Sequence, residues 1–256
     1  MLQFLIWLIY ILPVQQAPII NHSHDFFVVD HWGNIIMVGN NEIRTFNSKG
    51  DKIASFSNSM LGEIATIDAS NPLRLLVFYK EFNQVLFLDR NLAEIGTEID
   101  LYEYSENETE LLCSSPHGGF WIYNSIDNQT MHISEFGKTI NKSIILSDFW
   151  GSTIPSSMHI YANDLYLLYP EKGILILDQN GQFKKKISIP EIQNFQVNQN
   201  SIIYAKQSGL YSFNTLQKED TLIYQFEKQE IQNVVIYDYK IYLSNKKSIS
   251  ITPLTN

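Results

Sequence analysis

From residue 24 to its end, the chain alternates short apolar runs with polar turns. Two neighbouring runs are almost wholly apolar, for example 75–79 and 85–88, and a more polar run follows them. A strand covered on one face alternates apolar and polar residues, whereas a continuous apolar run predicts a strand covered on both faces. The pattern therefore predicts small sheets that are each sandwiched between two neighbours.

This unit of strands recurs about every 35–45 residues, which is typical of a β-propeller. We therefore predict an all-β fold: a single β-propeller of six blades with four antiparallel strands each. The first strand of each blade is expected to line a central channel, and counts of five or seven blades stay open. The predicted blades span residues 24–57, 62–100, 109–146, 157–190, 194–226 and 231–254.

The sixth blade has only three evident strands. Residues 18–21 are expected to supply its fourth strand, which would close the ring and remove the free edges of an open array. Outermost strands should be more polar. Three successive lysines, Lys184, Lys185 and Lys186, indicate a solvated edge strand that is protected against pairing with another molecule.

The turns between third and fourth strands are rich in Asn, Asp and Gly. Residues 47–51 and 178–181 place Asn or Gly where the backbone needs a positive φ. The sequence of the second turn is weakly similar to the start of a calcium-binding loop, but the later acidic ligands are missing. We interpret both segments as hairpin turns.

The composition is that of an ordinary globular protein, with 256 residues of which 45% are hydrophobic and 18% charged. The net charge of −9 argues against nucleic-acid binding and against electrostatic docking on anionic lipid, because both need a basic face. Cys113 is the single cysteine and cannot form an internal disulfide. We interpret it as a small buried apolar residue rather than as a nucleophile.

The first 17 residues are uncharged and contain an apolar run that is too short to span a bilayer. Pro13 followed by Ala17 is typical of the end of a signal peptide, although no Lys or Arg precedes the run. We predict a signal peptide at 1–17 and a propeller domain at 18–256. The protein would then be periplasmic or secreted, with no integral membrane span after signal removal. A buried first strand is the alternative for this segment.

Three segments carry a likeness to a known family, namely 70–92, 118–123 and 173–178, and 71–92 is the most specific of them. Through them the chain, over nearly everything after Ala17, resembles small secreted β-propeller proteins of Bacteroidetes, mostly Flavobacteria. The resemblance implies the fold and export. It implies no activity and no functional residues.

No motif for catalysis or metal binding stands out. The chain has no Gly-x-Ser-x-Gly elbow, no His-Glu-x-x-His helix and no Gly-rich phosphate loop after a strand. His22, His24 and Asp25 have the chemistry of zinc ligands, but no second group of ligands matches them. We therefore predict no catalytic residue, no metal site and no cofactor.

The turns that join second and third strands are the best candidates for a binding surface, because they share one face around the channel mouth. Aromatic rings and amides there suit a peptide or a sugar, and Trp is frequent at interaction hot spots. The residues predicted to bind are Tyr79, Phe82, Asn83, Tyr123, Trp150 and Tyr169. The alternative is that the three tyrosines pack between blades with their hydroxyls near the rim.

These observations favour an exported, non-enzymatic binding or scaffold module for a protein partner. Two alternatives stay open. One is an enzyme, a hydrolase or a lyase, whose site at the channel mouth draws residues from several blades. The other is a carbohydrate-binding propeller that uses exposed aromatic faces.

Overall fold

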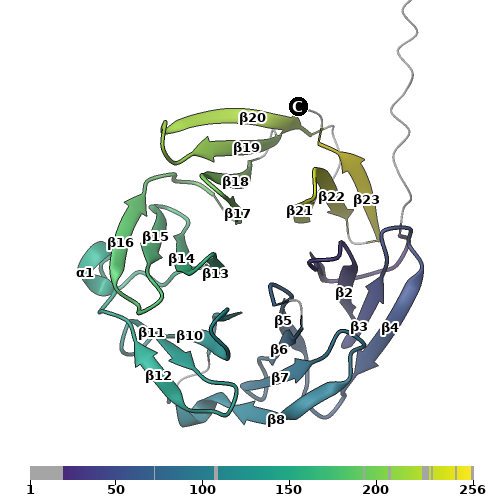
Figure 1. Cartoon of the computed structure of the whole chain (residues 1–256), viewed down its shortest axis with the longest axis horizontal. Coiled ribbons are helices and arrows are strands. Elements are labelled where there is room, and N and C mark those ends of the chain that lie inside the picture. Colours follow the sequence, from purple (N-terminus) through teal and green to yellow (C-terminus); the bar gives the residue numbers. More distant parts are fainter. Residues whose placement is uncertain are drawn as a thin grey trace, which may run out of the picture.

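The computed structural model describes residues 20–71, 73–106, 109–192, 194–206, 209–226, 231, 233–245 and 247–254. Its strands form six small antiparallel sheets arranged as a ring around a central axis (Figure 1). The predicted six-bladed β-propeller is therefore confirmed. The predicted signal peptide at 1–17 lies outside the described residues.

Every blade lies within the limits predicted from the sequence. Blades 1 to 3 contain β1 (Phe26–Val29), β2 (Ile35–Gly39), β3 (Glu42–Phe46), β4 (Lys52–Ser57), β5 (Ile64–Asp68), β6 (Leu75–Tyr79), β7 (Gln84–Leu88), β8 (Glu94–Asp100), β9 (Leu112–Ser114), β10 (Phe120–Asn124), β11 (Gln129–Ile133) and β12 (Thr139–Lys142). Blades 4 to 6 contain β13 (Ser157–Tyr161), β14 (Asp164–Tyr169), β15 (Gly173–Leu177), β16 (Phe183–Ile187), β17 (Phe195–Asn198), β18 (Ser201–Lys206), β19 (Gly209–Asn214), β20 (Glu219–Gln225), β21 (Asn233–Tyr237), β22 (Lys240–Asn245) and β23 (Ser248–Pro253).

Within each blade the strands follow chain order, and the first strand lies nearest the axis (Figure 1). Two short helices lie in connections between blades. They are a 3-10 helix, η1 (Leu101–Glu103), and a one-turn helix, α1 (Ser147–Trp150). Connections of this kind carry the chain from the outer strand of one blade back to the inner strand of the next.

The ring is closed by the N-terminal segment, as predicted. Ile20 pairs with Ile249 of β23, and the two residues exchange backbone N–H···O bonds of 3.0 Å in both directions. The buried side chain of Ile20 packs in one cluster with Phe27 of blade 1 and Tyr242 of blade 6. Ile20 therefore occupies the place of a fourth strand in blade 6 and joins that blade to the first.

The hydrophobic core lies between blades. Strands β6, β14 and β15 are buried along almost their whole length. Each hydrophobic cluster combines side chains of two neighbouring blades, for example Phe78 of blade 2 with Phe120 of blade 3. The cluster between blades 5 and 6 is the smallest, with three buried members in the described part of the chain. The double-sided burial predicted from the apolar runs is thus the main source of stability.

Outer strands and turns also follow the predicted chemistry. Lys184, Lys185 and Lys186 are exposed on β16. In the turn after β15, Asp178 Oδ1 accepts the backbone N–H groups of Asn180 and Gln182 at 2.8 and 2.9 Å. The carboxylate that suggested a calcium loop is therefore used to hold the hairpin turn.

We predict that Phe78→Ala destabilises the fold by about 3–5 kcal/mol, because it truncates a buried aromatic side chain between blades 2 and 3. Lys185→Ala, on the exposed edge of β16, should change the free energy of unfolding by less than about 0.5 kcal/mol. Urea unfolding of both variants measures the difference. Equal losses would contradict the burial order of the strands.

We also predict that Ile20→Ala costs about 2–5 kcal/mol, because Ile20 is buried where the N-terminal segment pairs with β23 and packs between blades 6 and 1. Ile53→Ala, an exposed isoleucine on β4, is the matched control and should have little effect. Thermal unfolding checks both. If Ile20→Ala is as stable as the control, the Ile20–Ile249 bridge does not stabilise the ring.

Candidate functional site

The antiparallel order of the strands places the turns of every blade on two opposite faces. Turns between first and second strands, and between third and fourth strands, share one face, which we call the cavity face. Turns between second and third strands share the other face with the connections from blade to blade. We call this second face the junction face. All six residues predicted to bind belong to it.

The three predicted tyrosines are buried. Tyr79 packs against blade 1, and Tyr123 and Tyr169 share a cluster between blades 3 and 4. Their hydroxyls have no hydrogen-bond partner among the described residues. Burial, with a smaller contribution from the charge of Glu94, raises the pKa of Tyr79 to about 12. The three tyrosines therefore pack between blades, as the alternative interpretation expected. Direct contact of these tyrosines with a binding partner stays a prediction.

Asn83 is buried as well and has a positive φ of 51°. Its side-chain Oδ1 accepts the backbone N–H of Thr109 at 3.0 Å, and its backbone oxygen accepts that of Leu101 at 2.9 Å. Both partners lie in the connection between blades 2 and 3. Asn83 therefore anchors this connection on the turn between β6 and β7.

Trp150 is half-buried at the end of α1 and meets one of the predicted tyrosines. Its ring centre lies 4.8 Å from that of Tyr169, edge to face. Lys186 Nζ lies 5.2 Å from the Trp150 ring centre, and Lys172 Nζ donates to the Trp150 backbone oxygen at 2.6 Å. The fold thus brings Trp150, Tyr169 and Tyr123 together, far along the chain from Tyr79, Phe82 and Asn83.

Phe82 is the most exposed of the predicted residues, at 47% of its surface. Two other large apolar side chains of the same face are exposed beside this turn. Met60 is 79% exposed in the connection between blades 1 and 2, and Tyr102 is 47% exposed in η1. No motif or spacing in the sequence groups these two residues with Phe82.

Contacts of the turn between β6 and β7 hold the three segments together. The bond from Leu101 N–H to Asn83 O places η1 against this turn. A Cβ atom built on Gly62 would lie 2.4 Å from Glu81 Oε2, so the connection that carries Met60 also touches the turn. Phe82 therefore lies between the two other exposed apolar segments.

Acidic side chains surround these apolar groups. Glu63, Glu81 and Glu103 are exposed, and none of them forms an ion pair within the described ranges. Lys80 is the one basic residue of the same turn. We call the combined surface the Phe82 patch, made of Met60, Glu63, Glu81, Phe82, Tyr102 and Glu103.

A cavity of about 1190 Å³ opens on the cavity face, around the ring axis. It is lined by the ends of inner strands and by the turns that follow them, in all six blades. None of the residues predicted to bind lines it. The polar and aromatic residues of its wall include Asp30, His31, Asn71, Ser114, Tyr161, Gln196, Asn198, Gln199, Asn200, Tyr237, Asp238 and Tyr239.

Hydrogen bonds between neighbouring blades surround this cavity. They join five of the six blade pairs and involve strand ends and the turns beyond them. The bonds are His31 Nε2 with Ser70 O, Ser114 N–H to Asp68 Oδ2 (2.8 Å), Gln199 N–H to Tyr161 Oη (2.7 Å), Ile236 N–H to Gln196 Oε1 (2.7 Å) and Tyr237 Oη–H to His31 O. The cavity wall is consequently fixed by contacts that a single blade cannot make.

Titratable groups near the axis serve structural contacts. The Asp30 carboxylate accepts three bonds of 2.8 Å from Trp32 and Asn34 in its own turn. His159 on β13 is partly accessible to solvent, but many protein atoms surround its ring. The resulting desolvation lowers the pKa of His159, and the negative charge of Asp68 raises it by a smaller amount. Burial raises the pKa of the Cys113 thiol well above its usual value. In the described ranges no three His, Cys, Asp or Glu side chains converge as a metal site would need.

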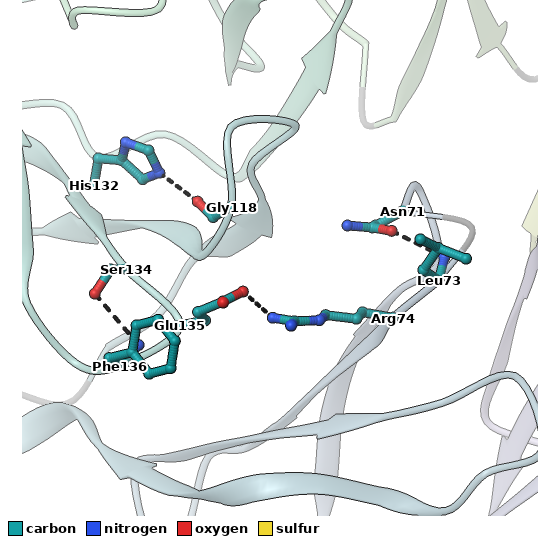
Figure 2. A network of polar contacts seen from close by, with 8 residues as sticks. All are labelled: Asn71, Leu73, Arg74, Gly118, His132, Ser134, Glu135 and Phe136. Atoms are coloured by element: carbon teal, nitrogen blue, oxygen red, sulfur yellow. Dashed lines mark hydrogen bonds and ion pairs between the residues drawn. The ribbon is translucent and has the colours of Figure 1, made fainter.

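Figure 2 shows the cavity face between blades 2 and 3. Arg74, next to β6, forms an ion pair with Glu135 in the turn between β11 and β12. The Arg74 guanidinium also lies 5.9 Å from the centre of the Phe87 ring. Arg74 and Glu135 also line a second, small cavity of about 50 Å³. Since the two charges offset one another, this contact joins blades and adds no net charge to the face.

No protein-family model matches the chain, and no curated protein matches it. No helix in the described part is long and apolar enough to cross a membrane.

The fold is similar to solved β-propellers at low sequence identity. Virginiamycin B lyase from Staphylococcus aureus has a TM-score of 0.63 and 12% identity over 92% of this chain and 96% of the lyase. BamB from Moraxella catarrhalis has a TM-score of 0.54 and 9% identity over 88% of this chain and 81% of BamB. PorZ from Porphyromonas gingivalis has a TM-score of 0.53 and 11% identity over 94% of this chain and 38% of PorZ. These likenesses identify the chain as a β-propeller.

Proposed function

We propose that the chain is an exported, non-enzymatic β-propeller that binds a protein partner through the Phe82 patch. The observation that carries the proposal is that Met60, Phe82 and Tyr102 are exposed on three separate segments that are held against one another on the junction face. Contiguous exposed apolar groups with a polar rim are typical of protein-interaction sites.

The charges of the patch indicate the kind of partner. Glu63, Glu81 and Glu103 have no cationic partner among the described residues, and they lie around the apolar groups. Complementary charge steers association and selects partners. A protein segment with Lys or Arg beside apolar side chains fits this surface best.

Binding is preferred to catalysis because three of the groups near the axis that could transfer a proton, namely Asp30, Asp68 and His31, already hold the fold. Asp30 caps its own turn, Asp68 accepts the backbone of Ser114, and His31 bonds to Ser70. A hydrolase or lyase would need such groups free to transfer protons. The likeness to virginiamycin B lyase supports the fold alone.

Export is supported by the uncharged apolar start of the chain and by its resemblance to secreted propellers of Bacteroidetes. The similar protein PorZ is described as a bacterial surface component of a type-IX secretion system. A periplasmic or surface location agrees with both observations.

We predict that the triple variant M60S/F82S/Y102S loses the partner that the wild-type chain retains from envelope extracts of its source organism. The exposed positions allow substitution with little effect on folding, whereas the apolar contact area is removed. Quantitative affinity capture followed by mass spectrometry measures the loss, which should be at least about tenfold.

The matched control is Leu216→Ser, an equally exposed apolar residue on the cavity face, which should capture the partner like the wild type. Raising salt from about 0.1 M to about 1 M shortens the Debye length from about 10 Å to about 3 Å and should weaken capture. Capture that is the same for the triple variant and the control would refute the role of the patch.

A further inference from the structure

The cavity on the cavity face has the size and position of a ligand site. Its volume of about 1190 Å³ compares with roughly 300–1,000 Å³ for typical small-molecule pockets. It lies on the face opposite to the Phe82 patch. Any ligand bound there would leave the patch free, so the site is independent of the proposed protein partner.

One turn of the wall presents uncommitted amide groups. Asn198, Gln199 and Asn200 follow each other at the end of β17 and in the turn before β18, and all are exposed. Their side chains make no hydrogen bond to any residue that the structure describes. Each amide offers two donor hydrogens and an acceptor oxygen.

This turn differs from the corresponding turns of blades 1 and 2. Asp30 and Asn71 use their side chains to cap the backbone of their own turns. In blade 5 the backbone N–H of Gln199 is held instead by Tyr161 Oη of blade 4, at 2.7 Å. Tyr161 of the neighbouring blade therefore accepts the backbone hydrogen bond that a capping side chain would accept. The side-chain amides of this turn can then bond to another molecule.

A buried hydroxyl in the same wall also lacks a partner. Ser114 is 4% exposed, lines the cavity, and its Oγ has no hydrogen-bond partner in the described ranges. Buried polar groups are rarely left unpaired, because desolvation without a new hydrogen bond is costly. A ligand hydroxyl, alone or through a water, would satisfy this group.

Aromatic rings of fixed position complete the wall. Tyr161 and Tyr237 are held by hydrogen bonds through their hydroxyls, and Tyr239, two residues after Tyr237, is 73% exposed. Among the described lining residues the carboxylate and imidazole groups are Asp30, His31 and Asp238, and Asp30 is committed to its turn. The wall therefore suits a ligand that has many hydroxyls, apolar ring faces and little charge.

From these groups we infer that the cavity binds a neutral oligosaccharide. The sugar hydroxyls are hydrogen-bonded by Asn198, Asn200 and Ser114, and an apolar sugar face lies on a tyrosine ring. An uncharged peptide also carries donors and acceptors, but it spaces them along an extended chain. The close grouping of three amides beside aromatic faces matches the clustered hydroxyls of a sugar better.

The test is isothermal titration of the full chain with four neutral tetrasaccharides, namely chitotetraose, cellotetraose, maltotetraose and xylotetraose, and with an uncharged Gly-Ser-Asn peptide. We expect one-to-one binding of at least one tetrasaccharide with a Kd below about 1 mM. The double variant N198A/N200A should weaken that binding at least about tenfold, as expected for two lost hydrogen bonds. Ser114→Ala should weaken it less.

Two controls separate this site from general effects. Q182A/Q217A removes two exposed amides from outer turns of the same face that do not line the cavity, and it should bind like the wild type. M60S/F82S/Y102S should also bind the sugar normally, even if capture of the protein partner is lost. Unchanged melting temperatures verify folding of every variant.

Three results would overturn the inference. They are no binding of any of the four tetrasaccharides up to about 10 mM, binding of the peptide alone, and equal affinity of N198A/N200A and Q182A/Q217A for the sugar. None of these outcomes bears on the Phe82 patch, since that surface lies on the opposite face.

Discussion

The burial of both faces of the middle strands against neighbouring blades is the interaction on which the whole structure depends. A single blade is a small twisted sheet with apolar side chains on both sides, so it is not stable alone. Strands such as β6 and β15 are buried along their length because the next blade covers each side. Closure of the ring is the only arrangement in which every blade has two such neighbours.

Polar contacts act on this apolar frame and fix its two faces. On the cavity face, hydrogen bonds between blades, such as the one from Ser114 to Asp68, align the inner strand ends. On the junction face, Asn83 holds the connection from blade 2 to blade 3 against a turn. Both candidate surfaces are therefore products of contacts between segments that are distant in sequence. This explains why rigid sites form although the residues come from loops.

The sequence was sufficient for the architecture because the apolar runs, the polar outer strands and the turn residues all agree on one fold. It was insufficient for the surfaces. An aromatic residue at a strand end, such as Tyr79 or Tyr169, looks the same whether it packs across a blade interface or meets solvent. Periodicity cannot separate these cases in a strand that is covered on both faces.

The cavity was missed for a related reason. The polar residues at the ends of inner strands are visible in the sequence, but their number and spacing are ordinary for turns. What distinguishes Asn198 and Asn200 is that Tyr161, from another blade, holds the backbone beside them. No local sequence pattern indicates a contact between two blades. The exposure of Met60 and Tyr102 on the same face as Phe82 is a second feature that depends on contacts between distant segments.

The bridge between Ile20 and Ile249 also has a consequence for biogenesis. The ribosome makes Ile20 before blade 1 and Ile249 only in blade 6, so one apolar side of the first blade is uncovered while the intervening blades are synthesised. Bringing such distant partners together is slow, because loop-closure entropy opposes it. Nascent chains would then be most prone to aggregation before β23 emerges, and a holding chaperone would help most at that stage.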